Sequence, residues 1–238
     1  LVAKARAARM VSPKDKKVDI PIEGGFVGMV NRDQFDEWLR VRAENHGAVR
    51  QRGVFDKLSR DDDGVSRVHF TIRTDDGMEK AASVRGRCII GADGARSEVA
   101  RQSVPGAEKT KYVFAYHESI QAPVQKPSHD GQRCDVYYQG EVSPDFYGWV
   151  FPHGKTLSVG TGSADKGYSL KAATARLREM TGLTDAKTIR REGAPIPLKP
   201  LPRWDNGRDV VLAGDASGVV APASGEGIYY AMYGGRIA

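Results

Sequence analysis

Two segments of the sequence each join an apolar run to a turn of glycine, aspartate and other small residues, and they restrict the fold more than any other feature. Residues 210–218 are Val-Val-Leu-Ala-Gly-Asp-Ala-Ser-Gly, and residues 90–97 are Ile-Gly-Ala-Asp-Gly-Ala-Arg-Ser. A strand that leads through such a turn into a helix places backbone N–H groups and a carboxylate where a polyol or a phosphate binds. Small residues let that ligand approach the backbone closely.

The rest of the chain divides by its apolar spacing. Residues 33–45 carry apolar side chains at helical spacing, with Asn31 or Asp33 as the expected cap. Residues 49–90 are strand-like segments separated by Asp-Gly turns, which is typical of a β-meander. The meander ends in the apolar run 88–90, which we expect to be a buried parallel strand.

Aromatic and β-branched residues interrupted by prolines fill residues 112–162, which indicates an antiparallel sheet in a separate domain. A helix over 170–180, an extended connector over 194–203 and a buried strand over 209–213 follow. Two short strands, 18–22 and 26–30, are expected around the Gly24 turn.

Composition excludes several classes of protein. The two cysteines, Cys88 and Cys134, are far apart, and no two histidines have metal-ligand spacing, so no metal site is predicted. No apolar run approaches the roughly 20 residues of a membrane-spanning helix. The net charge is +6, but acidic residues are interspersed and no basic patch alternates with stacking aromatics, which argues against nucleic acid. Basic residues are densest over 4–17, and a solvated surface is favoured there over an anion site.

Alternation places Tyr147, Trp149 and Phe151 on one side of a strand. Such an aromatic strip can line a slot for a long apolar tail, with a tyrosine hydroxyl or an indole N–H marking a polar end. The alternative is an ordinary domain core, which alternation alone favours.

Residues 214–228 resemble the GD motif of the glutathione-reductase-type flavoproteins related to p-hydroxybenzoate hydroxylase. Residues 90–97 resemble the DG fingerprint of the same flavoproteins, and residues 31–36 resemble their arginine-started helix. The resemblance implies FAD, with Asp215 on its ribityl chain and Asp93 near FAD and NAD(P)H. The implied cofactor-binding residues are Arg32, Asp93, Gly94, Gly214, Asp215, Pro222, Gly225, Gly227 and Ile228.

Each of these motifs has a purely structural alternative. Asp215 can cap a strand-turn-helix corner, Asp93 can stabilise its own turn, and Arg32 can be a surface arginine at a helix start.

Within these flavoproteins, the pattern PxxYxWxFP over residues 144–152 resembles the geranylgeranyl reductase branch. Residues 195–207 and 219–230 are more similar to the chlorophyll and bacteriochlorophyll tail reductases than to the archaeal lipid reductases. The resemblance implies an NADPH-using oxidoreductase that saturates prenyl double bonds of geranylgeranyl diphosphate or of geranylgeranylated (bacterio)chlorophyll. Tyr147, Trp149 and Phe151 then become substrate-binding residues. No proton donor stands out, and Tyr147 is a candidate without further support.

The resemblance also implies a mixed α/β fold, in which a Rossmann-like FAD-binding domain is interleaved with an antiparallel β-sheet substrate domain. We expect residues 1–30 and 105–202 in the substrate domain and residues 31–104 and 203–238 in the FAD domain. The family's GxGxxG unit is expected before Leu1, and a further region after Ala238. The expected localisation is cytoplasmic, with peripheral attachment to a photosynthetic membrane. (Bacterio)chlorophyll synthase is the expected partner.

Two other functions stay open. One is an FAD-dependent aromatic hydroxylase of the same fold, which would use oxygen. The other is a non-catalytic prenyl or pigment carrier, against which the intact residues 91–94 and 214–215 argue.

Overall fold

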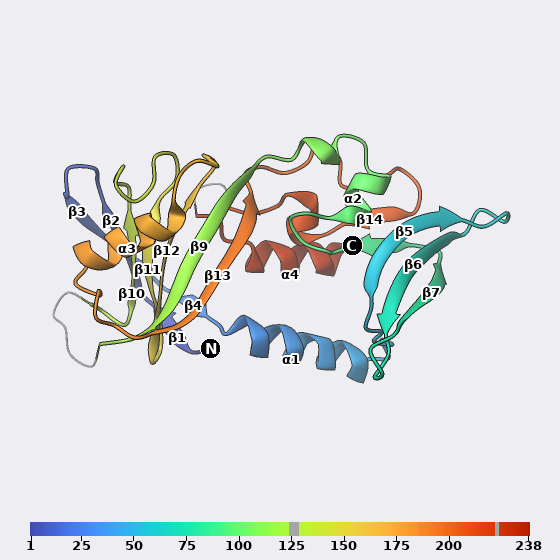
Figure 1. Cartoon of the computed structure of the whole chain (residues 1–238), viewed down its shortest axis with the longest axis horizontal. Coiled ribbons are helices and arrows are strands. Elements are labelled where there is room, and N and C mark those ends of the chain that lie inside the picture. The colour runs from blue at the N-terminus through green and yellow to red at the C-terminus, as the bar shows by residue number, and fades with distance from the viewer. Residues whose placement is uncertain (124–128, 222–223) are drawn as a thin grey trace. The chain divides into compact units, whose positions relative to one another are not determined.

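The computed structural model describes residues 1–123, 129–221 and 224–238 (Figure 1). The chain forms two compact units, and each is built from two separate segments. Unit 1 contains Leu1–Ala48 and Val113–Ala194, and unit 2 contains Val49–Tyr112 and Pro195–Ala238. These boundaries differ from the expected ones after residues 30, 104 and 202, and the assignment of each segment to cofactor or substrate stays a prediction.

Unit 1 contains a seven-stranded sheet with the strand order β13-β9-β12-β11-β10-β2-β3 (Figure 1). Strands β9, β12, β11 and β10 form successive antiparallel pairs, whereas β2 and β10 are parallel. The predicted antiparallel sheet is therefore mixed at that pair. The strands are β2 (Ala7–Val11), β3 (Lys17–Pro21), β9 (Tyr112–Gln121), β10 (Arg133–Tyr137), β11 (Gly148–His153), β12 (Thr156–Ser163) and β13 (Thr188–Pro197).

The seven-stranded sheet carries different side chains on its two faces. Helix α3 (Leu170–Met180) covers one face, where Leu177 packs with Val150, Leu157 and Val159. The opposite face carries a second apolar cluster that contains Tyr147 and Trp149. Unit 1 also includes the two-stranded ribbon β1 (Ala3–Ala5) and β4 (Val27–Met29), and helix α1 (Arg32–Asn45).

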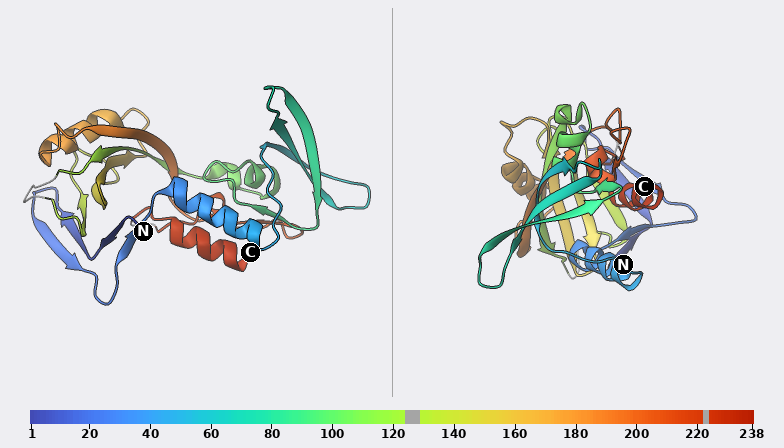
Figure 2. Two further views of the ribbon diagram at one scale, coloured as in Figure 1. Left: turned by 90° about the horizontal axis from the view of Figure 1, so that it is seen from below. Right: turned by 90° about the vertical axis from the view of Figure 1, so that its right-hand side faces the viewer.

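Unit 2 contains an antiparallel meander and a short parallel pair. Figure 2 shows the long meander strands from two further sides. The core of the unit joins α2 to the strand pair through Val99, Val104, Val210 and Leu212. Its elements are β5 (Val54–Arg60), β6 (Ser66–Arg73), β7 (Glu79–Gly86), β8 (Ile89–Gly91), α2 (Glu98–Ser103), the 3-10 turns η1 (Ala107–Lys109) and η2 (Gly214–Ser217), β14 (Val210–Leu212) and α4 (Ile228–Ile237).

Several local predictions are confirmed and others need correction. The helix over 170–180, the meander and the parallel strand after it are present. That strand is less buried than expected, because Ile90 is 50% exposed. The strands around Gly24 do not pair with each other, since β3 pairs with β2 and β4 with β1. The predicted connector begins inside β13, which continues to Pro197.

Helix α1 begins after Asn31, which occupies the predicted cap position without a side-chain hydrogen bond to the helix. Among the described residues, no helix is long and apolar enough to cross a membrane. In the same part of the chain, no group of three or more His, Cys, Asp or Glu side chains is arranged to hold a metal ion.

Candidate cofactor and substrate sites

The two glycine-aspartate motifs lie at the carboxyl ends of neighbouring parallel strands. Leu212 of β14 is directly beside Gly91 of β8, and the N–H of Ala213 donates to the carbonyl of Gly91 at 2.9 Å. Asp215 and Asp93 follow these two strand ends by two to three residues. The carboxyl ends of adjacent parallel strands are where doubly wound folds bind their ligands. The structure therefore brings the two predicted motifs together.

Asp215 lies in a turn that leaves little room beside its carboxylate. Gly214 has φ +63°, a conformation that favours glycine. A Cβ at Gly214 would lie 3.1 Å from Cβ of Ala231 in α4, and a Cβ at Gly227 would lie 3.0 Å from Oδ1 of Asp215. Gly227 thus places bare backbone against the carboxylate, and Gly214 places bare backbone against α4.

The loop before α4 is closed by its own backbone. The N–H of Gly225, which has φ +64°, donates to the carbonyl of Ala221 at 2.8 Å, and the N–H of Ala221 donates to the carbonyl of Glu226. Ile228 is the first residue of α4. The predicted contact at Pro222 lies outside the described residues.

Asp93 stabilises the start of α2. Its carboxylate accepts hydrogen bonds from the hydroxyl of Ser97 and from the N–H groups of Glu98 and Val99, the latter two at 2.8 and 3.1 Å. Gly94 has φ +85° and would meet no described atom within 4 Å with a Cβ. The structure thus gives Asp93 the turn-stabilising role, and a contact to a cofactor stays a prediction.

Arg32 belongs to unit 1 and forms a two-point ion pair with Asp36 one turn along α1, at 2.8 and 2.9 Å. The guanidinium holds the pKa of the Asp36 carboxyl below its usual value. The side chain of Arg32 is 61% exposed. Its predicted contact to a cofactor stays a prediction.

The predicted aromatic strip is present on the sheet face opposite α3. The ring centroids of Tyr147 and Trp149 are 5.9 Å apart, and those of Trp149 and Phe151 are 6.2 Å apart. Phe146 stacks on Tyr147 at 4.2 Å. Tyr147 and Trp149 are buried, so the strip is also part of the domain core. Burial raises the pKa of the Tyr147 hydroxyl, which therefore stays protonated at neutral pH.

A polar chain borders this strip, and sequence reasoning missed it. The indole Nε1 of Trp149 donates to Oγ of Ser158 at 3.1 Å, and that hydroxyl is 3.1 Å from Nδ1 of His117. Nε2 of His117 is 3.2 Å from Oε2 of Glu192. All distances fit one tautomer, in which Ser158 donates to Nδ1 and Nε2 donates to Glu192.

The pKa of His117 is lowered by burial, while Glu192 opposes that shift. Gly160 makes the close packing possible, because it lies directly opposite His117 and a Cβ there would come within 2.5 Å of the Trp149 indole. In the sequence, His117 is not near any residue that would indicate a role for it. Only the register of β9 with β12 brings it beside Trp149. Alternation along 112–121 could have placed His117 on one face, but not its neighbours.

Comparison with known proteins places these features in context. The model of a family described as FAD binding domain matches residues 4–234. The chain is 57% identical over 238 residues to geranylgeranyl diphosphate reductase of Rhodobacter capsulatus, covering 100% of the chain and 59% of that protein. It is 38% identical over 248 residues to the chloroplastic geranylgeranyl diphosphate reductase of Oryza sativa, covering 98% of the chain and 52% of that protein. The chain thus spans little more than half the length of these relatives.

Solved structures show the same fold. A geranylgeranyl bacteriochlorophyll reductase-like protein from Thermoplasma acidophilum superposes with a TM-score of 0.81 at 25% identity, covering 98% of this chain and 60% of that one. The flavin-dependent brominase Bmp2 superposes with a TM-score of 0.74 at 16% identity, covering 97% of this chain and 59% of that one. The second match, at that identity, speaks to the fold alone.

Proposed function

This chain belongs to the FAD binding domain family, and we propose that the protein is an FAD-dependent, NADPH-using reductase of prenyl double bonds. Its substrate is geranylgeranyl diphosphate or geranylgeranylated (bacterio)chlorophyll. The observation that carries this proposal is the 57% identity with the Rhodobacter reductase along the whole chain. The aromatic strip supports it, since a long apolar tail needs a long apolar surface.

The cofactor is held by residues around the two strand ends. Asp215 would accept hydrogen bonds from the ribityl hydroxyls of FAD, and the backbone of Gly225, Gly227 and Ile228 would contact the flavin. Glycine at position 227 keeps a methyl group away from Oδ1 of Asp215. When bound, FAD supplies the hydride that it obtains from NADPH.

The strip and its polar border act on the substrate. The rings of Tyr147, Trp149 and Phe151 exclude water from the alkene, and this exclusion protects a cationic carbon from hydration. An isolated alkene needs a positioned acid at the second carbon. Tyr147 Oη and His117 are the candidates, although burial lowers the pKa of His117 and so disfavours the protonated form that an acid needs.

The product is lipid-soluble, so we propose peripheral attachment to a photosynthetic membrane, with (bacterio)chlorophyll synthase as a partner. Fractionation of the native full-length protein tests this. Recovery entirely in the soluble pool, with the substrate accepted there, contradicts it.

The reductase is tested with the full-length protein under anaerobic conditions, with FAD, NADPH and each candidate substrate. We expect stepwise mass gains of two hydrogens in the prenyl chain. Trp149→Phe should raise KM for the prenyl substrate, whereas Trp204→Phe, a change of the same kind outside the strip, should not. Flavin reduction that leaves both substrates unchanged, with a hydroxylated product once oxygen is admitted, would identify a hydroxylase instead.

A further inference from the structure

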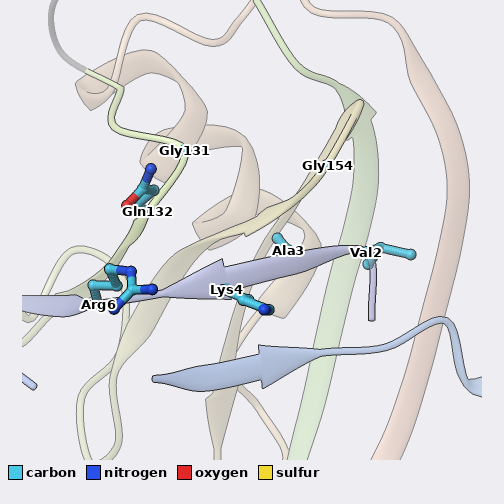
Figure 3. Close-up of a pocket in the computed structure, with 7 residues that line it drawn as sticks. All are labelled: Val2, Ala3, Lys4, Arg6, Gly131, Gln132 and Gly154. Carbon is cyan, nitrogen blue, oxygen red and sulfur yellow. The ribbon is translucent and has the colours of Figure 1, made fainter. Parts of the chain in front are cut away.

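A cationic hollow lies in unit 1 at the end of the sheet where β11 turns into β12 (Figure 3). It has a volume of about 330 Å³, and its walls come from the start of the chain and from two turns. Lys4 and Arg6 contribute the charges, and Gly131 and Gly154 contribute bare backbone. Among the lining residues that the structure describes, none is acidic. The hollow therefore has the charge of an anion site.

The two cations are available to a ligand. Both side chains are exposed, and neither forms an ion pair with another residue in the described part of the chain. Lys4 lies over the ring of Phe26 at 4.8 Å, a contact that leaves its ammonium protons accessible. Asp130, the acidic residue nearest to Gly131 in the sequence, accepts from the N–H of Gln132 at 2.8 Å and lies 4.0 Å from Arg133. Gln132 lines the hollow, so Asp130 lies beside it, and Arg133 partly offsets the charge of that carboxylate.

The hollow lies at one end of the aromatic strip. Tyr147, Trp149 and Phe151 follow β11 toward His153, and Gly154 is the next residue. His153, which shares the face of Trp149 by alternation, has Nε2 3.1 Å from the carbonyl of Val30 after β4. A Cβ at Gly154 would lie 2.9 Å from the carbonyl of Val2, just before β1. The β1–β4 ribbon therefore meets the strip's face at this end.

The spacing suits an amphiphile. Gly154 lies seven positions after Tyr147, or roughly 23 Å along the strand at about 3.3 Å per residue. An extended apolar tail along the rings would place its head group at Lys4 and Arg6.

We propose that the Lys4–Arg6 hollow binds the diphosphate head group of a prenyl diphosphate whose tail follows the Tyr147–Trp149–Phe151 strip. This inference rests on the proposed function and deepens it. It assigns the free diphosphate as the substrate, because a pigment ester brings no such charge to the hollow.

The test uses the full-length protein loaded with FAD. Two double variants are compared. The pocket pair carries Lys4→Gln and Arg6→Gln. The control pair carries Lys14→Gln and Lys16→Gln, which remove two exposed charges from the β2–β3 turn of the same basic stretch. Calorimetry measures the Kd of inorganic diphosphate, of geranylgeranyl diphosphate and of NADPH. We expect the pocket pair to weaken both diphosphates about tenfold or more, and the control pair to leave them within about twofold.

Unchanged diphosphate binding in the pocket pair overturns the proposal. So does a selective loss of NADPH binding, or a loss of binding to phosphatidylglycerol vesicles with diphosphate binding retained, which would assign the hollow to a lipid surface. If no prenyl substrate is reduced but the pocket pair still loses diphosphate, the anion site stands and the proposed function falls. If the pocket pair reduces geranylgeranyl diphosphate with an unaltered KM, the proposed function stands and the proposed anion site falls.

Discussion

Gly227 faces the carboxylate of Asp215 so closely that a Cβ at position 227 would lie 3.0 Å from Oδ1. The backbone of Gly227 has φ −122°, which any residue adopts. A methyl group there would therefore act on the carboxylate and not on the backbone conformation. Glycine is therefore required at position 227 by the space beside the Asp215 carboxylate and not by the backbone conformation of the turn.

We accordingly expect Gly227→Ala to weaken FAD binding about tenfold, because the carboxylate must move. Thermal stability of the apoprotein should change little. Flavin fluorescence titration of the full-length protein measures the Kd. Gly235→Ala in α4, where a Cβ meets no described atom within 4 Å, is the matched control. Equal FAD affinities in the two variants would remove Asp215 from the cofactor site.

The Arg60–Asp209 pair connects the meander to β14. Both oxygens of Asp209 accept from Arg60, and Ser66 and Asn206 donate to the same carboxylate at 2.7 and 3.0 Å. These bonds hold the pKa of Asp209 far below its usual value. Since Arg60 is partly solvated, we expect Asp209→Ala to cost about 1–3 kcal/mol, less than a fully buried pair.

The sign of the pH dependence follows from that lowered pKa. Asp209 stabilises the native state fully above its unfolded pKa of about 3.9 and loses this effect as pH falls toward the native pKa. The difference between wild type and Asp209→Ala in urea unfolding should therefore shrink below about pH 4. Asp62→Ala, at the exposed end of the meander, is the control and should change the free energy of unfolding little.

Gly160 has no space for a side chain. A Cβ there would be 2.5 Å from the Trp149 indole and 2.6 Å from the carbonyl of Tyr116. Gly160→Ala should destabilise the sheet by about 1–3 kcal/mol through overpacking, and denaturant unfolding measures this. Gly140→Ala meets nothing within 4 Å and should be nearly neutral. A neutral Gly160→Ala would show that β9 and β11 move easily away from β12, which lies between them.

His117 should titrate below the usual histidine pKa of about 6.5. Burial lowers its pKa, Arg190 and His153 add to that effect, and Glu192 opposes it. Protonation therefore costs native stability as pH falls through this range. NMR of the imidazole should show Glu192→Gln moving the midpoint further down, and Glu179→Gln, a change on α3, leaving it in place. An upward shift in Glu192→Gln would contradict the described contact.

The sequence predicts those elements whose signal is local. Helix α3 is amphipathic and capped by Ser169, and the meander has its Asp-Gly turns. The two similar motifs each predicted a buried strand, but they did not predict that β8 and β14 pair with each other, 121 residues apart in register. The FAD-binding fold is confirmed by the family match.

Long-range pairing explains what could not be predicted. Two strands flanking one turn, β3 and β4, join different partners because β1 and β2 precede them, and local spacing does not record this. The series of polar side-chain contacts from Trp149 to Glu192 depends on three strand registers: β11 with β12, β12 with β9, and β9 with β13. The hollow at Lys4 is also lined by Gly131 and Gly154, which are far from Lys4 in the sequence. The basic stretch over residues 4–17 could therefore predict only a solvated surface.

The division of each unit into two segments has a consequence for biosynthesis. Val49–Tyr112 leaves the ribosome before Val113–Ala194, yet it belongs with Pro195–Ala238. Unit 1 can close as soon as Ala194 has emerged, whereas strand β8 waits for β14, its partner among the strands that the structure describes. Nascent chains that stall between these points expose a sheet edge, a state that invites aggregation and engages chaperones. The order of translation thus makes unit 2 the later and more vulnerable of the two units.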